Sequence, residues 1–408
     1  MELQCTGIAN GGDAVSRAED GRVVFVRRGL PGERVSVRFT HQARDFARAV
    51  VTHVFEASAM RQEPTCPHVA SGCGGCGWQH VAFSAQHELK RAIVVEALER
   101  IGKLVGVDAR VTNGPLLGGY GYRTTVRALV ENGRVGFRSE QSNDAVEVDS
   151  CEVTDPVLEY TLMHSNFGPA REVTVRRGTV TGEVMVIVDP SPDGVCVVTG
   201  HSVASLRVVG VAELADDDQP FFHEMIRGHR FRISAGAFFQ TRHDGTELLV
   251  QLVDDALRSF DAPPDVLADL YGGVGLFAVT LGERFTDVVS VEREGCSSRD
   301  AAVNLATFDN SRAVASDVAD FDLSSYARGR STLVVADPAR AGLGRTAVER
   351  IVACEPRGVV LVSCDAASLG RDAALLAAAG YRLRSSVVVD MFPHTPHVEV
   401  VSCFDPPL

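Results

Sequence analysis

The segment that ends at Cys364 carries the residue best suited to covalent chemistry. An apolar run over residues 359–362 and then Ser363 lead up to this thiol, and Asp365 leads from it into an Ala-rich stretch. A strand that delivers a thiol to its carboxyl end, just before a helix, places it where an open α/β sheet usually binds its ligand. The competing interpretation is a buried structural cysteine, because free cysteine is among the most buried residue types.

A second polar segment, residues 390–399, supplies candidate bases. It reads Asp-Met-Phe-Pro-His-Thr-Pro-His-Val-Glu and ends at Glu399. The His-Val context before Glu399 predicts a partly buried carboxylate, which suits a general base. His394 and His397 are alternative bases, although a structural histidine is the more common interpretation. Cys364 and Glu399 would together provide a nucleophile and a base.

A glycine-rich loop predicts a nucleoside cofactor. Residues 269–277, Asp-Leu-Tyr-Gly-Gly-Val-Gly-Leu-Phe, include Tyr271 and Gly273 and join an apolar strand to a helix. Glu292 ends the next strand, where a carboxylate can accept hydrogen bonds from both hydroxyls of a ribose. The glycine spacing is not G-x-G-x-x-G and no phosphate-binding run is present, so S-adenosylmethionine fits better than NAD. The competing interpretation is a glycine-rich turn in an unrelated sheet.

Two further acidic residues are candidate cofactor ligands. Asp337 follows the strand-like run 333–336, so we expect it at the same sheet edge as the glycine loop and Cys364. Asp317 could meet an adenine ring, although an Asp in a loop is most often a turn former.

Four cysteines are candidate metal ligands. Cys66, Cys73 and Cys76 fall within eleven residues, and Cys151 is a distant fourth. Such a set could hold zinc or an iron–sulfur cluster. The spacing alone favours zinc slightly, with His68 or His80 as competing ligands, and a group of unligated thiols is the remaining interpretation.

The elements that position these residues fall into three regions. Residues 1–58 read as short strands, which predicts an OB-like β-barrel, and residues 59–225 read as a central α+β domain that opens with the cysteines and a long helix. Residues 226–408 alternate strand and helix, which predicts a doubly wound, mostly parallel α/β sheet of Rossmann type.

Composition limits the functional classes. The chain of 408 residues has ten cysteines, no apolar run long enough to span a membrane and no visible secretory signal, so we expect a cytoplasmic protein. The formal net charge of −13 disfavours nucleic acid, but eight arginines between Arg17 and Arg48 make a basic region that could hold RNA. A solvated barrel surface explains those arginines equally well. We expect a monomer without membrane contact.

Two motifs give the chain a family resemblance. Asp337 to Gly342 reads D-P-A-R-A-G, and the later strand ends in Ser363-Cys364; residues 390–399 match D-x-F-P-x-[ST]-x-H-x-E in full. In this order the motifs resemble those of the RNA uracil-C5 methyltransferases that use S-adenosylmethionine, and the likeness covers nearly the whole chain. Leu361, Asp365 and Ser368 depart from the Tyr, Asn and Thr of the pattern. Residues 7–33 resemble a TRAM domain, an RNA-binding barrel.

The resemblance implies roles for particular residues. Cys364 would add to C6 of a uracil, Glu399 would remove the C5 proton, and Gln240 would lie near the methyl donor. The cysteine set resembles that of members with a 4Fe-4S cluster, although six residues separate Cys66 from Cys73 where the pattern has five. The expected product is 5-methyluridine in RNA, with ribosomal RNA favoured over transfer RNA. Asp365 adds a carboxylate that could raise the pKa of the nucleophile.

Other functions remain open at this point. An RNA-binding iron–sulfur protein without catalysis is the first alternative, and retention of both Cys364 and Glu399 disfavours it. Methylation of a small molecule or of cytosine is the second alternative. The TRAM-like region disfavours a small molecule, and the complete motif around Glu399 disfavours cytosine.

Overall fold

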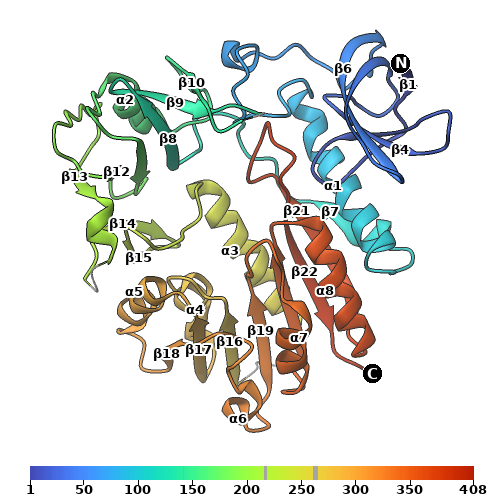
Figure 1. Cartoon of the computed structure of the whole chain (residues 1–408). Coiled ribbons are helices and arrows are strands. Elements are labelled where there is room, and N and C mark those ends of the chain that lie inside the picture. The colour runs from blue at the N-terminus through green and yellow to red at the C-terminus, as the bar shows by residue number, and fades with distance from the viewer. Residues whose placement is uncertain (141, 216–217, 261–264) are drawn as a thin grey trace.

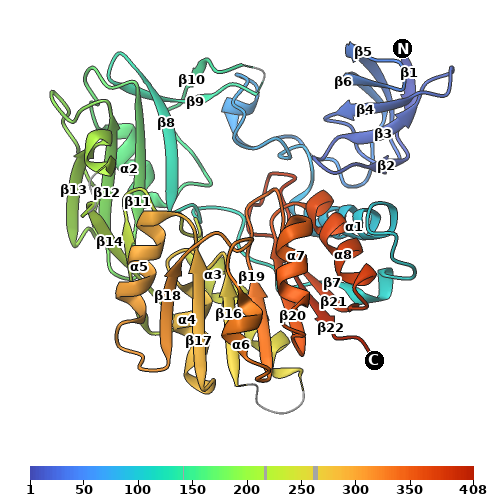
Figure 2. The same ribbon diagram turned by 60° about the horizontal axis from the view of Figure 1, so that its bottom comes forward.

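The chain forms three main sheets. In Figure 1 the N-terminal sheet is blue, the central sheet is green, and the C-terminal sheet runs mostly from yellow to red. The structure is a computed structural model that describes residues 1–140, 142–215, 218–260 and 265–408. The N-terminal and central sheets occupy two sides of the same end of the C-terminal domain, as the turned view also shows (Figure 2).

The N-terminal sheet curls into half a barrel. Its order is β1-β5-β6-β4-β3-β2; β4 and β6 are parallel, and the other neighbours are antiparallel. The edge strands β1 and β2 are nearly consecutive along the chain, so the two edges of the sheet are drawn toward each other. Small apolar side chains that alternate along the strands form its core. The strands are β1 Glu2–Gln4, β2 Gly7–Ile8, β3 Ala14–Arg17, β4 Val23–Arg27, β5 Arg34–Gln42 and β6 Phe46–Glu56.

The central sheet has the order β10-β9-β8-β11-β12-β13, and only β12 and β13 are parallel neighbours. Helix α2 packs its buried leucines on the sheet, and a separate hairpin, β14–β15, leads toward the C-terminal domain. The elements are β8 Thr125–Glu131, β9 Arg134–Arg138, β10 Ala145–Glu147, α2 Pro156–His164, β11 Glu172–Arg177, β12 Glu183–Asp189, β13 Ser205–Gly210, β14 Phe221–Ile226 and β15 His229–Ser234.

The C-terminal sheet is Rossmann-like, with the order β18-β17-β16-β19-β20-β22-β21-β7. Strands β16 to β20 are parallel, β22 is antiparallel to its neighbours, and the strand order reverses between β16 and β19. Such a switch point opens a crevice at the carboxyl ends of the strands. The elements are α3 His243–Arg258, β16 Val266–Leu270, α4 Leu276–Leu281, β17 Asp287–Glu292, α5 Gly295–Leu305, β18 Ser311–Ala315, α6 Leu323–Ala327, β19 Thr332–Ala336, α7 Gly344–Val352, β20 Gly358–Ser363, α8 Ala366–Ala378, β21 Arg382–Val389 and β22 Glu399–Asp405.

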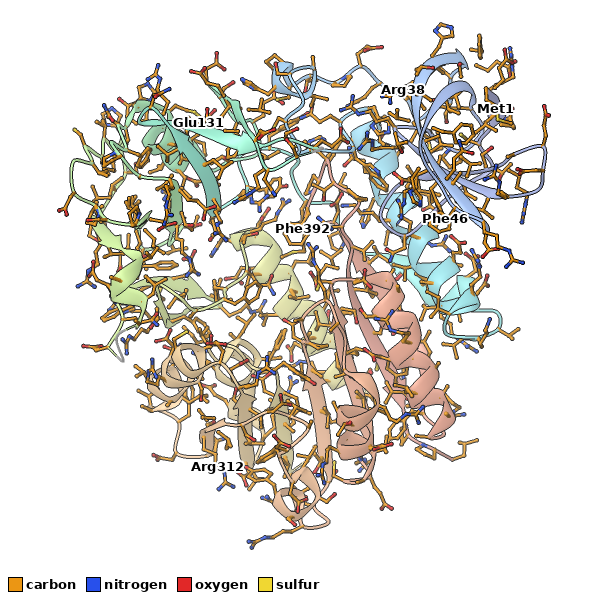
Figure 3. All side chains as sticks on the ribbon, viewed as in Figure 1. Met1, Arg38, Phe46, Glu131, Arg312 and Phe392 are labelled. Carbon is orange, nitrogen blue, oxygen red and sulfur yellow. The ribbon has the colours of Figure 1, made fainter. Side chains whose placement is uncertain are left out.

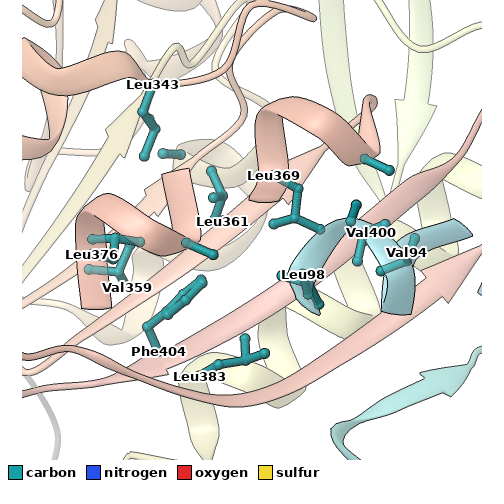
Figure 4. Close-up of a cluster of buried hydrophobic side chains, with 14 of the residues drawn as sticks. Val94, Leu98, Leu343, Val359, Leu361, Leu369, Leu376, Leu383, Val400 and Phe404 are labelled. Atoms are coloured by element: carbon teal, nitrogen blue, oxygen red, sulfur yellow. The ribbon is translucent and has the colours of Figure 1, made fainter. Parts of the chain in front are cut away.

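Side-chain alternation along the buried strands builds a core on each face of this sheet. In β20, Val359 and Leu361 pack with α7, α8 and α1, whereas Val360 and Val362 pack with α3 and α4. Figure 4 shows the first of these cores, in which Leu369 and Leu98 come from different helices. Because both faces are covered, the strands read as continuous apolar runs in the sequence.

Two elements from the middle of the chain pack on the C-terminal sheet. Helix α1 (Phe83–Arg100) buries Ile93 and Leu98 in the core that α8 also lines, and β7 (Val111–Asn113) adds a parallel edge strand beside β21. The domain boundaries at residues 58 and 225 stay predictions. Within the described ranges, no helix combines the length and the apolar character that a membrane span needs.

Candidate active site and cysteine cavity

One cavity of about 890 Å³ opens at the carboxyl edge of the C-terminal sheet. It is lined by every residue that the sequence predicted to be catalytic or to bind the cofactor: Cys364, Glu399, Gln240, Tyr271, Gly273, Glu292, Asp317 and Asp337. These residues come from several different strand ends and loops, so the parallel sheet is what brings them together.

The pairing of β20 with β22 positions Cys364 beside Glu399. The last pair of this antiparallel ladder is Ser363 with Val400, so Cys364 and Glu399, the next residue on each side, lie at the same end of the strand pair. Both line the cavity, and the charge of Glu399 acts on the Cys364 thiol. Glu399 is only 3% exposed, whereas Cys364 is half-buried at the cavity wall.

Burial and neighbouring carboxyls shift the pKa values of Cys364, Asp337 and Glu399 upward, toward the neutral forms. Burial, then Glu399 and Asp337, raise the pKa of Cys364 to about 12, and Arg340 opposes them. Burial raises the pKa of Asp337 to about 7. Burial and then the charge of Asp337 raise the pKa of Glu399 well above its usual range. The resting thiol is therefore protonated, and the two carboxyls disfavour being ionised together.

Asp365 caps the helix that follows the nucleophile. Its Oδ1 accepts the Ser368 N–H at 2.8 Å and so caps α8, while its Oδ2 accepts the side-chain amide of Asn10 at 3.3 Å. The charges that raise the pKa of Cys364 most are those of Glu399 and Asp337. A carboxylate at this position therefore serves as a helix cap and a contact to the N-terminal half-barrel.

The glycine loop turns through several residues of left-handed backbone and leaves no room for a side chain at Gly272. Tyr271, Gly273 and Gly275 all have positive φ, at 59°, 55° and 88°. A Cβ on Gly272 would lie 2.1 Å from Ser290 Oγ. The loop therefore turns tightly from β16 into α4 and leaves its backbone open to the cavity.

The acidic residues around this loop hold its backbone. Glu292 accepts the N–H groups of Gly273 at 3.0 Å and Glu294 at 2.7 Å, and it lines the cavity. Asp317 accepts the Ala319 N–H at 2.9 Å and pairs with Arg293 at 3.1 Å, so it forms a turn and also lines the cavity.

Helix α1 anchors segment 390–399 through Lys90. Lys90, which is fully buried, donates to Asp390 Oδ1 at 2.5 Å and to the Phe392 carbonyl at 3.0 Å. Figure 3 shows Phe392 at the end of the C-terminal sheet that faces the other two sheets. His394 is buried, its backbone N–H donates to Gln86 Oε1 at 2.7 Å, and it is not among the residues that line the cavity. His397 lines the cavity, and burial lowers its pKa to about 4.

Two lining residues, Arg340 and Phe238, and one buried residue behind the glycine loop, Asp269, were not assigned from the sequence. Arg340 lowers the pKa of Cys364, and its place in the D-P-A-R motif could have revealed it. Phe238, which is 67% exposed, lies two residues before Gln240 at the cavity wall. Asp269 is fully buried behind the loop, accepts the Ala278 N–H at 3.0 Å, and has a pKa raised to about 7 by burial.

A second cavity, of about 210 Å³, is lined by all four predicted cysteine ligands. Burial raises the pKa of Cys66, Cys73 and Cys76, and their mutual proximity with Cys151 raises these values further. In the described part of the chain, no three His, Cys, Asp or Glu side chains are arranged to hold a metal ion.

The two histidines that could compete as ligands differ in position: His68 Nδ1 lies 3.7 Å from Cys66 Sγ, whereas His80 lies outside the cysteine cavity. His68 lines the cysteine cavity and its Nε2 lies 3.1 Å from an oxygen of Asp149. His80 is buried, does not line the cavity, and has a pKa lowered by burial to about 4.

The chain is similar to known proteins along nearly its whole length. A protein of Streptomyces avermitilis named as an uncharacterized RNA methyltransferase is 32% identical over 429 residues, which cover 99% of this chain and 98% of that protein. The 23S rRNA (uracil(1939)-C(5))-methyltransferase RlmD of Aeromonas hydrophila is 30% identical, covering 99% of this chain and 94% of that enzyme. No protein-family model matches the chain.

A solved structure shares the fold. The tRNA (uracil-54, C5)-methyltransferase of Pyrococcus abyssi, solved with S-adenosyl-L-homocysteine, superposes with a TM-score of 0.72 at 22% identity, covering 98% of this chain and 99% of that one. The sequence relatives, this common fold, and the cavity that Cys364 and Glu399 line together with the glycine loop all support one assignment. The chain is an enzyme of the S-adenosylmethionine-dependent RNA uracil-C5 methyltransferase family.

Proposed function

We propose that the enzyme transfers a methyl group from S-adenosylmethionine to C5 of a uridine in ribosomal RNA. The observation that carries this proposal is that Cys364 and Glu399 line one cavity together with the glycine loop, at the same end of the β20–β22 pair. The ribosomal RNA preference rests on the relative from Aeromonas hydrophila, whose name specifies 23S rRNA. An inactive RNA-binding protein would have no need of that pairing.

The residues at the cavity suit a covalent mechanism. C5 of uracil is too weak a nucleophile to accept a methyl group unaided. Addition of the Cys364 thiolate to C6 breaks the C5–C6 double bond and moves electron density to C5. S-adenosylmethionine, when bound, would supply the methyl group to C5 and would leave as S-adenosylhomocysteine once its methyl–sulfur bond breaks. Glu399 then removes the C5 proton, the double bond re-forms, and the C6–S bond breaks to release Cys364.

The cofactor would lie between the glycine loop and the catalytic pair. We propose that Glu292 binds the ribose hydroxyls, that Tyr271, Gly273 and Asp317 border the nucleoside, and that Gln240 and Asp337 flank the methyl-donor end. These residues fit such a molecule because the cavity of about 890 Å³ is lined both by the glycine loop and by the partly exposed carboxylate of Glu292. A target base inside folded RNA would have to be flipped into the cavity.

We also propose that the four cysteines hold a 4Fe-4S cluster. Four thiols around one cavity are the donor set that such a cluster takes, and a single zinc ion bound by the same thiols is the alternative. The methylation needs no electron transfer, so the cluster would brace the central domain. Iron and sulfide analysis of protein purified without oxygen tests this; stoichiometric zinc in place of iron would refute it.

The N-terminal half-barrel would act as the TRAM-like RNA-binding module of a monomer. Several of its arginines already pair with carboxylates, such as Arg28 with Glu140 at 2.9 Å and Arg48 with Asp13 at 3.3 Å. Its available positive charge is therefore smaller than the sequence suggests, and RNA contact would rely on fewer residues.

The proposed reaction is tested with labelled S-adenosylmethionine and total RNA that lacks the modification. Wild-type protein should place label in 5-methyluridine of large ribosomal RNA, and the Cys364→Ala variant should place none. Label confined to transfer RNA would overturn the ribosomal preference. Absence of transfer to any RNA, from protein that binds S-adenosylhomocysteine, would overturn the proposed substrate.

A further inference from the structure

The segment that runs from the last residue of β15 toward α3, residues 234–240, brings Gln240 and Phe238 to the wall of the catalytic cavity. It has no regular hydrogen-bond ladder of its own, so its path depends on what holds its backbone. The groups that hold it come mostly from the central part of the chain.

Arg176 of β11 makes three hydrogen bonds to the backbone of this segment. Its Nη1 donates to three carbonyl oxygens of the segment, those of Ser234 at 3.2 Å, Ala235 at 3.0 Å and Ala237 at 2.8 Å. The side chain is only 4% exposed, and its guanidinium carbon lies 5.0 Å from the centre of the Phe222 ring. Burial lowers its pKa to about 10, which still leaves it charged at neutral pH.

A carboxylate completes this arrangement from the opposite side. Asp300 of α5 accepts the Ser234 N–H at 2.6 Å and the Ser234 hydroxyl at 2.8 Å. The Ser234 peptide groups therefore lie between a buried cation and a buried anion. Hydrogen bonds to charged groups are about twice as strong as neutral ones, which makes this the firmest point of the segment.

Two neutral contacts fix the rest of the segment. Gln219 accepts the Gly236 N–H at 3.0 Å, and a Cβ on Gly236 would lie 2.9 Å from that same oxygen. Immediately after Gln240, the Thr241 carbonyl accepts the Thr124 N–H at 2.8 Å. The backbone on both sides of Gln240 is thus tied to the central part of the chain.

We infer that Arg176 is a positioning residue for methyl transfer: it fixes the backbone of residues 234–237 and thereby the placement of Gln240 in the cofactor cavity. This inference rests on the proposed function of the cavity, and it makes the central sheet a part of the catalytic apparatus. Arg176 does not line the cavity, so its effect passes through the segment that it holds.

The test measures S-adenosylhomocysteine binding by calorimetry, together with the KM for S-adenosylmethionine and kcat. Arg176→Met keeps the length of the side chain and removes the donors, and Arg176→Lys restores a buried cation. We expect the dissociation constant and the KM to rise about tenfold in Arg176→Met and about threefold in Arg176→Lys. Arg171→Met removes an exposed arginine of the same region that pairs with Asp189, and should change neither value.

A double-variant cycle separates positioning from general stability. If Arg176 acts through Gln240, then Arg176→Met should weaken binding far less in a Gln240→Ala background than in the wild type. A lower melting temperature with unchanged KM and binding in Arg176→Met would overturn the inference, as would full additivity with Gln240→Ala. Failure of wild-type protein to bind S-adenosylhomocysteine would instead overturn the proposed function.

Discussion

Replacing Glu399 with Gln should convert the enzyme into one that captures its RNA. The side chain is nearly isosteric, and Glu399 is only 3% exposed at the start of β22, so the change keeps the shape of the site. It removes the group proposed to take the C5 proton. Loss of a general base slows turnover by about 100- to 10,000-fold.

The same substitution should leave the first covalent step intact or make it faster. Glu399 raises the pKa of Cys364, which stands at about 12. At pH 8 a thiol with that pKa is ionised to about one part in 10,000, and each unit by which the pKa falls gives about tenfold more thiolate. Removing the neighbouring carboxyl lowers the pKa of Cys364, so addition to C6 should not be the step that suffers.

The assay is denaturing gel electrophoresis of the variant with labelled RNA and S-adenosylmethionine. The methylated adduct forms but cannot eliminate, so a protein–RNA band resistant to denaturation should accumulate in Glu399→Gln. Cys364→Ala and the double variant are the matched controls and should give no band. The pH dependence of Cys364 alkylation checks the predicted fall in its pKa. A variant that turns over as fast as wild type, or that loses both turnover and adduct, would refute this reasoning.

Three other predictions concern the loop, the pH dependence and the buried ion pair. Gly272→Ala should weaken S-adenosylhomocysteine binding about tenfold or more in calorimetry, because a Cβ there would lie 2.1 Å from a side-chain oxygen; unchanged affinity would contradict this. With saturating substrates, the transfer rate should climb from about pH 6 to about pH 9, because the pKa values of Cys364 and Glu399 are both raised and each must ionise to act; a rate that falls over this range would contradict the assignment. Lys90→Met should destabilise the protein by about 3–5 kcal/mol in urea unfolding, because it leaves the carboxylate of Asp390 buried and unpaired, and the further change Asp390→Asn should recover much of the loss; a near-neutral effect of the single variant would argue against the buried ion pair.

The catalytic half of the fold follows closely from sequence pattern. Apolar runs at 266–270, 333–336 and 359–362 correspond to β16, β19 and β20, because strands buried on both faces need continuous apolar residues. Parallel pairing then brings the residues that follow each strand to one edge. The order of strands and helices along the chain therefore suffices to predict that Asp337 and Cys364 lie at the same cavity.

What the sequence did not predict depends on contacts between distant segments. Lys90 meets Asp390 across 300 positions, and Asn10 meets Asp365 across 355. Local periodicity carries no information about such pairs, so Lys90 read only as one position of a long helix. The three carbonyls held by Arg176 are likewise backbone groups, which no sequence motif records.

The measurement that most directly tests the central claim uses RNA in which the target uridine carries fluorine at C5. After methyl transfer, C5 bears fluorine and methyl with no proton for Glu399 to remove, so the adduct cannot break down. Protease and nuclease digestion followed by mass spectrometry should then find a methylated fluorouridine nucleotide attached to Cys364, formed only when S-adenosylmethionine is present. An adduct on another of the ten cysteines, or methyl transfer to RNA without any adduct at Cys364, would contradict the account.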